Sequence, residues 1–553
     1  MLGCVMVAHA QERLSGKSFA TRAEVMAPHA MVATSHPIAN QIAIEILKKG
    51  GSAVDAAIAA NAFLGLAEPE MCGPGGDLFA IVWDAKQKKL IGLNGSGRSP
   101  KNLTLEYFRS KNIDHIPTKG PLCVTVPGCV DGWFTLHGKF GKLPMAELLS
   151  PTVQYAREGV PLTPEETDFM KIIQRQQPEN IDSRPNFKQL FYPGGRLLKK
   201  GEVFKNPDLA ATYEKIIRGG RDAFYKGELA KSIVAHIKSV GGFLSVEDLA
   251  AHTSEWVQPI STNYRGYDVW ELPPNGQGIA VLQMLNILEG FDMASFGFGS
   301  PEHLHYFIEA KKLAFEDMAH YCSDPAFSTI PVEKLISKAY AAERRKLIQK
   351  DRAGEYDFGT PSPNHTTYLT VADKDGNMVS LIQSVAGLFG SMEVPAGLGF
   401  VLQNRGMAYE LTENQLNSYA PGKRPFHTII PAFVTKDGKP YMSFGLLGGD
   451  MQTQGHVQVL MNLIDFGMNL QEAGDAPRVN HSGTFPVRGH VKGTGQLSIE
   501  SGFSQETIQA LMLMGHTIQH DLGVFGGYQA ILFDGSVYYG ASDPRKDGQA
   551  SGY

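Results

Sequence analysis

The sequence has few cysteines and no surplus of basic residues. Its five cysteines are odd in number and form no CxxC pair, which argues against both a disulfide framework and a zinc site. His303 and His305 are two residues apart, which on a helix points them to different faces, so they are not expected to share a metal. A formal net charge of −5 lacks the basic surplus that phosphate-backbone binding requires, so nucleic acid is not an expected partner. No stretch approaches the roughly 18 consecutive apolar residues of a membrane span.

The motifs of several common enzyme classes are also missing. There is no GxSxG nucleophile elbow and no HExxH metal motif. The glycine-rich turn at Gly73, Gly75 and Gly76 leads into a predicted strand, whereas a nucleotide phosphate loop leads into a helix. The sequence therefore gives no support for a serine triad on an α/β-hydrolase fold, a metallohydrolase or a dinucleotide site.

Two helices are predicted near the start of the chain. Isoleucines recur at four-residue spacing after Pro37 and stop at the pair Gly50-Gly51, which is typical of a capped helix. A second helix, from about 53 to 66, is rich in small residues and nearly free of polar ones, so it is expected to be buried. Asp55 on that helix then needs a partner.

The rest of the 553 residues read as blocks of helices and strands. Residues from about 144 to 350 are predicted to be mainly helical, and the segment PLCVTVPGCV, with Cys123 and Cys129, to be a core strand. After residue 366 the pattern changes to three hairpins around Asp-Gly turns, with helices between them. These turns are Asp375-Gly376, Asp437-Gly438 and Asp534-Gly535. The arrangement favours sheets covered by helical layers.

A pair of threonines opens the first hairpin. A connector rich in proline, glycine and charge, residues 349–365, precedes Thr366 and Thr367 and is expected to be exposed. A threonine hydroxyl is a weak nucleophile until a base takes its proton. If the peptide bond before Thr366 is cut, the freed α-amine has a reference pKa of about 7.7–8.0 and lies on the residue that bears the hydroxyl. The pattern therefore suggests that the chain is cut there.

Several separated segments resemble the gamma-glutamyltranspeptidase family of N-terminal-nucleophile hydrolases. They are TTYLTVADKDGNMVSLIQS, ILKKGGSAVDAAIAANAFLGLAEPE with the glycine-rich turn after it, GKRPFHTIIPAFVTKDGKPYMSFGLLGGD and GASDPRKDG. They occur in the family's order over nearly the whole chain. The resemblance implies an α+β, four-layer αββα sandwich that needs no cofactor. It also implies a precursor that cuts itself between His365 and Thr366 into a large subunit (31–365, after an N-terminal arm of 1–30) and a small catalytic subunit (366–553), which stay associated.

The resemblance also implies which residues carry the reaction. Thr366 falls on the family's nucleophile, with Thr367 beside it, and Ser384 on a hydroxyl that hydrogen-bonds the nucleophile. Gly448 and Gly449 fall on the oxyanion pair. Consecutive glycines let the backbone come close to a substrate and aim N–H groups at a developing oxyanion, although a turn needed only for packing is the alternative.

The positions that hold a glutamyl head group in the family differ in this chain. Ser96 stands in place of an arginine, with Arg98 two residues later; Ala386, Arg405 and Ala408 stand in place of an asparagine, a glutamine and an acid; His427-Thr428 replace a serine pair. Losing charged partners costs recognition of a zwitterion about 1.5–3 kcal/mol per charged hydrogen bond. A binding site for an anionic group without a neighbouring ammonium is therefore predicted, with ordinary structural contacts as the alternative. Its residues are Arg98, Arg405, His427 and Thr428.

The expected function is hydrolysis of a small-molecule amide through an acyl-threonine, with transfer to an acceptor left open. The acyl group is a γ-glutamyl or similar carboxylated group, as in glutathione. An oxamate amidohydrolase or a cephalosporin-acylase-like amidase of the same family is the second prediction. An uncleaved scaffold that binds a small anion is the alternative from another class, but a scaffold has no need of a nucleophile together with oxyanion donors.

The first residues, MLGCVMVAHAQ, leave the compartment open. Ala8-His9-Ala10 fits a small-x-small cleavage site, but the positive n-region is missing and the apolar stretch is short. A signal remnant would make the protein periplasmic or secreted, and the alternative is a cytoplasmic protein. A dimer of the processed heterodimer is also left open.

Overall fold

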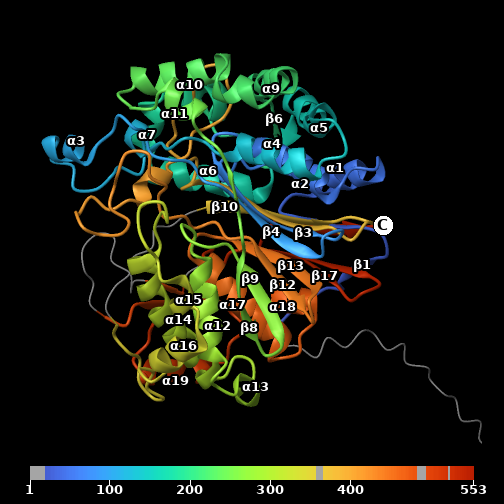
Figure 1. Ribbon diagram of the computed structural model, residues 1–553, viewed down its shortest axis with the longest axis vertical. Helices are drawn as coiled ribbons and strands as arrows, with labels where there is room; N and C mark the ends of the chain where they lie inside the picture. The colour runs from blue at the N-terminus through green and yellow to red at the C-terminus, as the bar shows by residue number, and fades with distance from the viewer. Residues whose placement is uncertain (1–18, 357–364, 483–492, 521–522) are drawn as a thin grey trace, which may run out of the picture.

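The computed structural model describes residues 19–356, 365–482, 493–520 and 523–553, so the proposed signal remnant lies outside the described residues. Two antiparallel seven-stranded sheets lie face to face, and helices cover the outer side of each (Figure 1). The four-layer αββα arrangement expected from the sequence is confirmed. Among the described residues, no helix combines the length and apolar character that a membrane crossing requires.

Both sheets mix strands from before and after residue 365. The first sheet has the order β19 (Gln549–Gly552), β2 (Met31–Thr34), β10 (His365–Ala372), β11 (Met378–Ala386), β3 (Asp77–Asp84), β4 (Lys89–Gly95) and β7 (Glu255–Val257). The second has the order β1 (Val25–Ala27), β18 (Tyr538–Ser542), β17 (Gly527–Phe533), β13 (Lys439–Leu447), β12 (Ala432–Lys436), β9 (Tyr267–Glu271) and β8 (Ile260–Tyr264). Ladder hydrogen bonds therefore join the two halves of the chain, and a cut before Thr366 would leave the products bound to each other.

Helices from the first half of the chain cover the outer face of the first sheet (Figure 1). They are α1 (Pro37–Lys48), α2 (Ala53–Ala67), α4 (Cys129–Phe140), α5 (Met145–Glu158), α6 (Pro164–Gln176), α7 (Pro178–Asp182), α8 (Pro185–Phe191), α9 (Pro207–Tyr225), α10 (Glu228–Ser239) and α11 (Val246–Ala250). The short helix α3 (Leu105–Ser110) packs in a separate apolar cluster with Cys123, Met407 and Tyr419. Every residue of α2 is buried, as predicted. Its Asp55 has the partners it needs, because the carboxylate accepts the N–H groups of Ser52, Lys142 and Leu143.

A second group of helices covers the other sheet. They are α12 (Gly278–Leu288), α13 (Met293–Phe296), α14 (Pro301–Tyr321), α15 (Val332–Leu335), α16 (Lys338–Arg345), α17 (Met451–Ile464), α18 (Leu470–Asp475) and α19 (Gln505–Leu513). Smaller elements are η1 (Pro121–Cys123), η2 (Pro193–Gly195), η3 (Arg405–Ala408), β5 (Val160–Pro161), β6 (Val203–Phe204), β14 (Val479–Ser482), β15 (Gln496–Ile499) and β16 (Thr517–Gln519). Between the two sheets lies an apolar layer that includes Phe79, Trp83, Tyr368, Ile382 and Phe433.

Two sequence-based predictions differ from the structure. The segment with Cys123 and Cys129 is not a strand: Cys123 ends η1 and Cys129 begins α4. Pro121 and Pro127 fix φ and lack an N–H to donate to a ladder, which explains the difference. Both cysteines are nevertheless buried in the core, as expected. The middle of the chain, predicted to be mainly helical, also contributes the hairpin β8–β9 to the second sheet.

Candidate active site

Thr366 is fully buried at the start of β10. A register shift between His365 and Thr367 sets it off the regular pairing with β11. Its Oγ1 accepts a hydrogen bond from Gln452 Nε2 (3.2 Å), and Gln452 Oε1 in turn accepts the N–H of Ile430 (3.1 Å). Gln452 therefore fixes the Thr366 hydroxyl as a hydrogen-bond acceptor. The hydroxyl's proton is not used in this contact and is available to a base. Gln452 was not among the residues predicted from the sequence, although its place just after the glycine pair was a usable signal.

Ser384 and Asp77 lie on β11 and β3, the next two strands of the sheet after the β10 strand that carries Thr366. Ser384 lies on β11, opposite Asp77 on β3, and its Oγ accepts the N–H of Ala386 (2.7 Å). Asp77 is fully buried, and its carboxylate accepts hydrogen bonds from Gly97 N, Gly128 N, Gln403 Nε2 and His427 Nε2. Asp77, which sequence analysis missed, thereby ties the glycine-rich turn to His427.

The glycine pair forms the turn between β13 and α17. Gly448 and Gly449 have φ angles of 121° and 61°, in the left-handed region that favours glycine. The carbonyl of Gly449 accepts a hydrogen bond from Gln277 Nε2 (2.9 Å), which also donates to the carbonyl of Thr428 (2.6 Å). Within the described part of the chain, neither glycine N–H donates to another residue. Both N–H groups are thus available to an oxyanion.

Arg405 on η3 is an arginine with only 1% of its surface exposed. Its Nη1 donates to Thr428 Oγ1 (2.9 Å), whereas Nε and Nη2 are buried without a partner among the described residues. Burial lowers the pKa of Arg405 to about 10, and the charge of Asp77 opposes that shift, so the guanidinium stays charged at neutral pH. Nε and Nη2 form one edge of the guanidinium, the fork that binds a carboxylate through two hydrogen bonds.

His427 is fully buried between Asp77 and Phe79, and its Nε2 lies 3.0 Å from an Asp77 carboxylate oxygen. Burial lowers the pKa of His427 to about 4, with a further contribution from the Arg405 charge, while Asp77 acts in the opposite direction. The imidazole is therefore neutral at neutral pH. Of these two neighbours, Arg405 is charged and His427 is neutral.

We expect His427→Gln to change how stability depends on pH. The unfolded imidazole binds a proton below about pH 6.5 and the folded one only below about pH 4, so the wild type loses up to about 3 kcal/mol of unfolding free energy as pH falls through that window. The variant lacks this loss, and all other titrating groups are common to both proteins. The melting temperatures of the wild type and of His427→Gln, measured from pH 7.5 to 4, should therefore approach each other as the pH falls. A difference that stays constant with pH contradicts the assignment.

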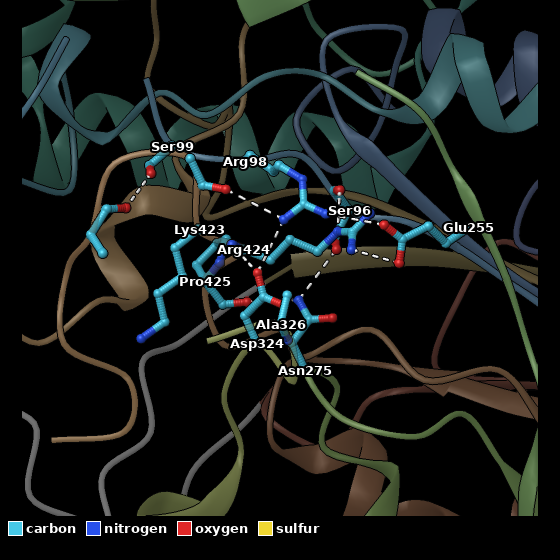
Figure 2. Close-up of polar contacts among 12 residues, drawn as sticks. Ser96, Arg98, Ser99, Glu255, Asn275, Asp324, Ala326, Lys423, Arg424 and Pro425 are labelled. Carbon is cyan, nitrogen blue, oxygen red and sulfur yellow. Dashed lines mark hydrogen bonds and ion pairs between the residues drawn. The ribbon is translucent and has the colours of Figure 1, made fainter. Parts of the chain in front are cut away.

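Arg98 lies in a different network of contacts, drawn in Figure 2. Its Nη1 is 3.2 Å from an Asp324 oxygen and its Nη2 is 3.0 Å from a Glu255 oxygen. Arg424 contacts the other Glu255 oxygen through Nη1 (2.9 Å) and donates its N–H to Asp324 (2.8 Å). The two carboxylates of Glu255 and Asp324 thus balance the charges of Arg98 and Arg424 together. Of the four predicted binding residues, the structure brings together Arg405, His427 and Thr428 but places Arg98 elsewhere.

Thr367 contacts a different set of side chains from Thr366, as expected for consecutive strand residues, which face opposite sides of a sheet. Its Oγ1 donates to Glu68 Oε2 (2.7 Å) and lies 2.9 Å from Ser35 Oγ. Neither Glu68 nor Ser35 was singled out from the sequence. Both precede residue 365, so this contact joins the two proposed subunits.

His305, Glu309 and His516 are the group of described residues with metal-binding spacing. Glu309, however, forms a buried ion pair with Lys312, and it accepts hydrogen bonds from the N–H of Gly354 (3.0 Å) and the hydroxyl of Tyr356 (2.8 Å). We therefore assign Glu309 to holding the chain before the proposed cleavage site. Residues 357–364 of the predicted connector, and the side chain of His365, lie outside the described residues.

Comparisons with known proteins identify relatives over almost the full length. The profile of the family described as Gamma-glutamyltranspeptidase matches residues 39–553. A glutathione hydrolase-like YwrD proenzyme of Bacillus subtilis (strain 168) is 37% identical over 542 residues, which cover 94% of this chain and 98% of the relative. An oxamate amidohydrolase proenzyme of Klebsiella pneumoniae is 30% identical over 537 residues, with coverages of 95% and 98%. The crystal structure of a cephalosporin acylase from Bacillus halodurans superimposes with a TM-score of 0.89 at 42% identity, covering 99% of both chains.

Proposed function

Because the chain belongs to the gamma-glutamyltranspeptidase family, we propose that it is a proenzyme that cuts itself before Thr366 and then works as an N-terminal-threonine amidohydrolase. The observation that carries the proposal is the buried Thr366 hydroxyl, which Gln452 holds close to the turn of Gly448 and Gly449. A nucleophile and unpaired N–H donors in one place are what acyl transfer requires.

Self-cleavage uses the Thr366 hydroxyl against the peptide bond that precedes it. Oγ attacks the carbonyl carbon of His365, the C–N bond breaks, and the proton from Oγ ends on the amine of Thr366. Water then hydrolyses the ester, which gives the carboxyl group of His365 and restores the hydroxyl. The N–H groups of Gly448 and Gly449 stabilise the oxyanion formed at each stage.

Turnover repeats this chemistry with a substrate amide in place of the peptide bond. The freed α-amine of Thr366 takes the proton from Oγ, an acyl-threonine forms, and the substrate's amine leaves with that proton. Water, or an acceptor amine, attacks the acyl-threonine and completes the reaction. Each step needs only groups on this chain, the substrate and the acceptor.

The acyl group carries a carboxylate, and the free edge of Arg405 supports this. Nε and Nη2 of this buried, charged guanidinium have no hydrogen-bond partner among the described residues, and two N–H groups on one edge match the two oxygens of a carboxylate. Thr428 and the neutral His427 complete this side of the site. A γ-glutamyl or similar group, as in glutathione, is our first candidate, in keeping with the family and the relative named glutathione hydrolase-like.

An oxamate-type substrate is the second candidate. Ala386 and Ala408 stand where the family holds the substrate's ammonium, so Arg405 would bind an anion that has no ammonium beside it. Oxamate carries its carboxylate next to the amide and has no amine to place. A relative of similar length is named oxamate amidohydrolase.

Substrate screening tests the proposal directly. The purified, matured protein is incubated with glutathione, a γ-glutamyl anilide, oxamate, a glutaryl amide and the uncharged amide of butyric acid. We expect hydrolysis of at least one carboxylated amide and none of the uncharged one. An intact single chain that binds anions but hydrolyses no amide would instead support the scaffold alternative.

We expect Gly449→Ala to slow both self-cleavage and turnover. Gly449 has a φ of 61°, where an alanine is strained, and the strain would tilt its N–H away from the oxyanion. Loss of one oxyanion donor typically costs about 10²–10³ in kcat. The rate of band splitting on a denaturing gel, and kcat of the processed fraction, measure the effect.

Gly467→Ala is the matched control for this prediction. Gly467 has nearly the same φ, 62°, and a Cβ there would meet nothing within 4 Å. It lies after α17, at the other end of that helix from the glycine pair. If both variants lose stability equally and only Gly449→Ala loses rate, the effect belongs to the oxyanion donor; equal rates in both would disprove that role.

A further inference from the structure

We propose that Glu68, together with Ser35, is a positioning residue for the catalytic threonine and acts through Thr367, an inference that rests on the function proposed above. Thr367 Oγ1 donates to Glu68 Oε2 (2.7 Å) and lies 2.9 Å from Ser35 Oγ. All three residues are buried, with exposed fractions of 4% for Glu68, 2% for Ser35 and 1% for Thr367. Solvent does not weaken a contact of this kind.

The contact lies where the regular pairing of β10 stops on one side. Along β11, the pairing of β10 runs from His365 to Ala372, but along β2 it begins only at Leu369. Thr367 is two residues beyond that ladder, and Ser35 follows directly after β2. Hydrogen bonds between the Thr367 hydroxyl and the side chains of Ser35 and Glu68 therefore hold the strand where its regular pairing with β2 has ended.

The contact of Thr367 with Glu68 and Ser35 becomes important once the chain has cut itself. Once the bond before Thr366 is cut, Thr366 becomes a chain terminus, and termini fray unless they are tied down. Its hydroxyl and its new amine must both stay in place, because a misplacement of about 1 Å can cost on the order of 10² in rate. Fixing Thr367 fixes the peptide unit that carries Thr366.

The loop that carries Glu68 is itself firmly held. Glu68 caps the C-terminal end of the fully buried helix α2, where its N–H donates to the carbonyl of Leu64 (2.7 Å), and its own carbonyl accepts the N–H of Met71 (3.0 Å). Burial raises the pKa of Glu68 to about 7, and the hydrogen bonds from Ser35 and Thr367 act against that shift. The proposed role is to accept a hydrogen bond, which a neutral carbonyl oxygen also does, so it does not require a charge.

Substitutions at Glu68 separate this role from simple packing. We expect Glu68→Ala to lower kcat of the processed enzyme about 10- to 100-fold with KM changed less than twofold, measured on the substrate that the wild type hydrolyses fastest in the panel above. Glu68→Gln keeps an acceptor oxygen in the same place and should restore kcat to within about threefold of the wild type. A KM effect without a kcat effect contradicts the proposal.

Glu70→Ala is the matched control, because Glu70 lies two residues away and is fully buried. Neither oxygen of its carboxylate has a hydrogen-bond partner among the described residues. The same truncation there should leave kcat within twofold of the wild type. Equal losses of kcat in Glu68→Ala and Glu70→Ala would mean that any cavity in this loop impairs the enzyme, which would overturn a specific role for Glu68.

A double-mutant cycle with Thr367→Val completes the test. If Glu68 acts only through Thr367, the double variant should be no slower than the slower single variant. Losses that multiply overturn the proposal. If Glu68→Ala does not fold, Thr367→Val alone decides, because an unchanged kcat there also overturns it. A wild type that is cut and active beside an equally active Glu68→Ala refutes only this inference, whereas an uncut, inactive wild type refutes the proposed function as well.

Discussion

Thr366→Ala is expected to remain a single chain of 60.2 kDa and to lose amidase activity by a factor on the order of 10⁴–10⁶. The Thr366 hydroxyl is the attacking group in both self-cleavage and turnover, so one substitution removes both. The rest of the site, including the glycine pair and Gln452, stays in place. Intact mass spectrometry and a denaturing gel measure the cleavage, and hydrolysis of the substrate panel measures the amidase activity.

Two further variants make this result specific. Thr366→Ser keeps a hydroxyl and should still give two chains, with the smaller one beginning at residue 366. Thr370→Ala is the matched control, because Thr370 is also a buried β10 threonine with a hydroxyl contact, to Ser443 Oγ (2.6 Å). It should mature like the wild type. Two bands from Thr366→Ala would place the scissile bond or the nucleophile elsewhere.

The elements that sequence analysis predicted correctly are those with strong local signals. The helix that starts at Pro37 has its proline at one end and the glycine pair just beyond the other, and each Asp-Gly turn lies between two strand-like runs. The hairpin β8–β9 lacks such a turn and has Arg265-Gly266 instead. The prolines around Cys123 mattered more than the apolar pattern that suggested a strand.

In the candidate site too, the residues within contiguous motifs were predicted from the sequence, whereas contacts between distant residues were not. Thr366 and the glycine pair belong to motifs that are contiguous in the sequence. Asp77 and His427 are 350 residues apart, and Gln452 and Thr366 are 86 apart, so their contacts depend on the assembled sheets. Arg98 and Arg405 looked alike in the sequence. Only the folded chain places Glu255 and Asp324 beside Arg98 and, within the part of the chain that the structure describes, leaves Nε and Nη2 of Arg405 without a partner.

Arg405→Met should lower kcat/KM for a carboxylated amide about 10²- to 10⁴-fold, mostly through KM. The substitution removes two charged hydrogen bonds, each worth about 1.5–3 kcal/mol, and every 1.4 kcal/mol is a factor of ten. Arg405→Lys keeps the charge but not the two-pronged edge, so we expect an intermediate loss. Steady-state kinetics on the substrate panel measure both variants.

Self-cleavage and Arg98→Met serve as controls for this prediction. The bond between His365 and Thr366 presents no free carboxylate to Arg405, so Arg405→Met should mature at nearly the wild-type rate. In Arg98→Met the substrate kinetics should change less than threefold, because Glu255 and Asp324 already bind that guanidinium. A larger loss in Arg98→Met than in Arg405→Met would transfer the anion-binding role to Arg98. The carboxylate would then have to displace two acidic side chains to be bound.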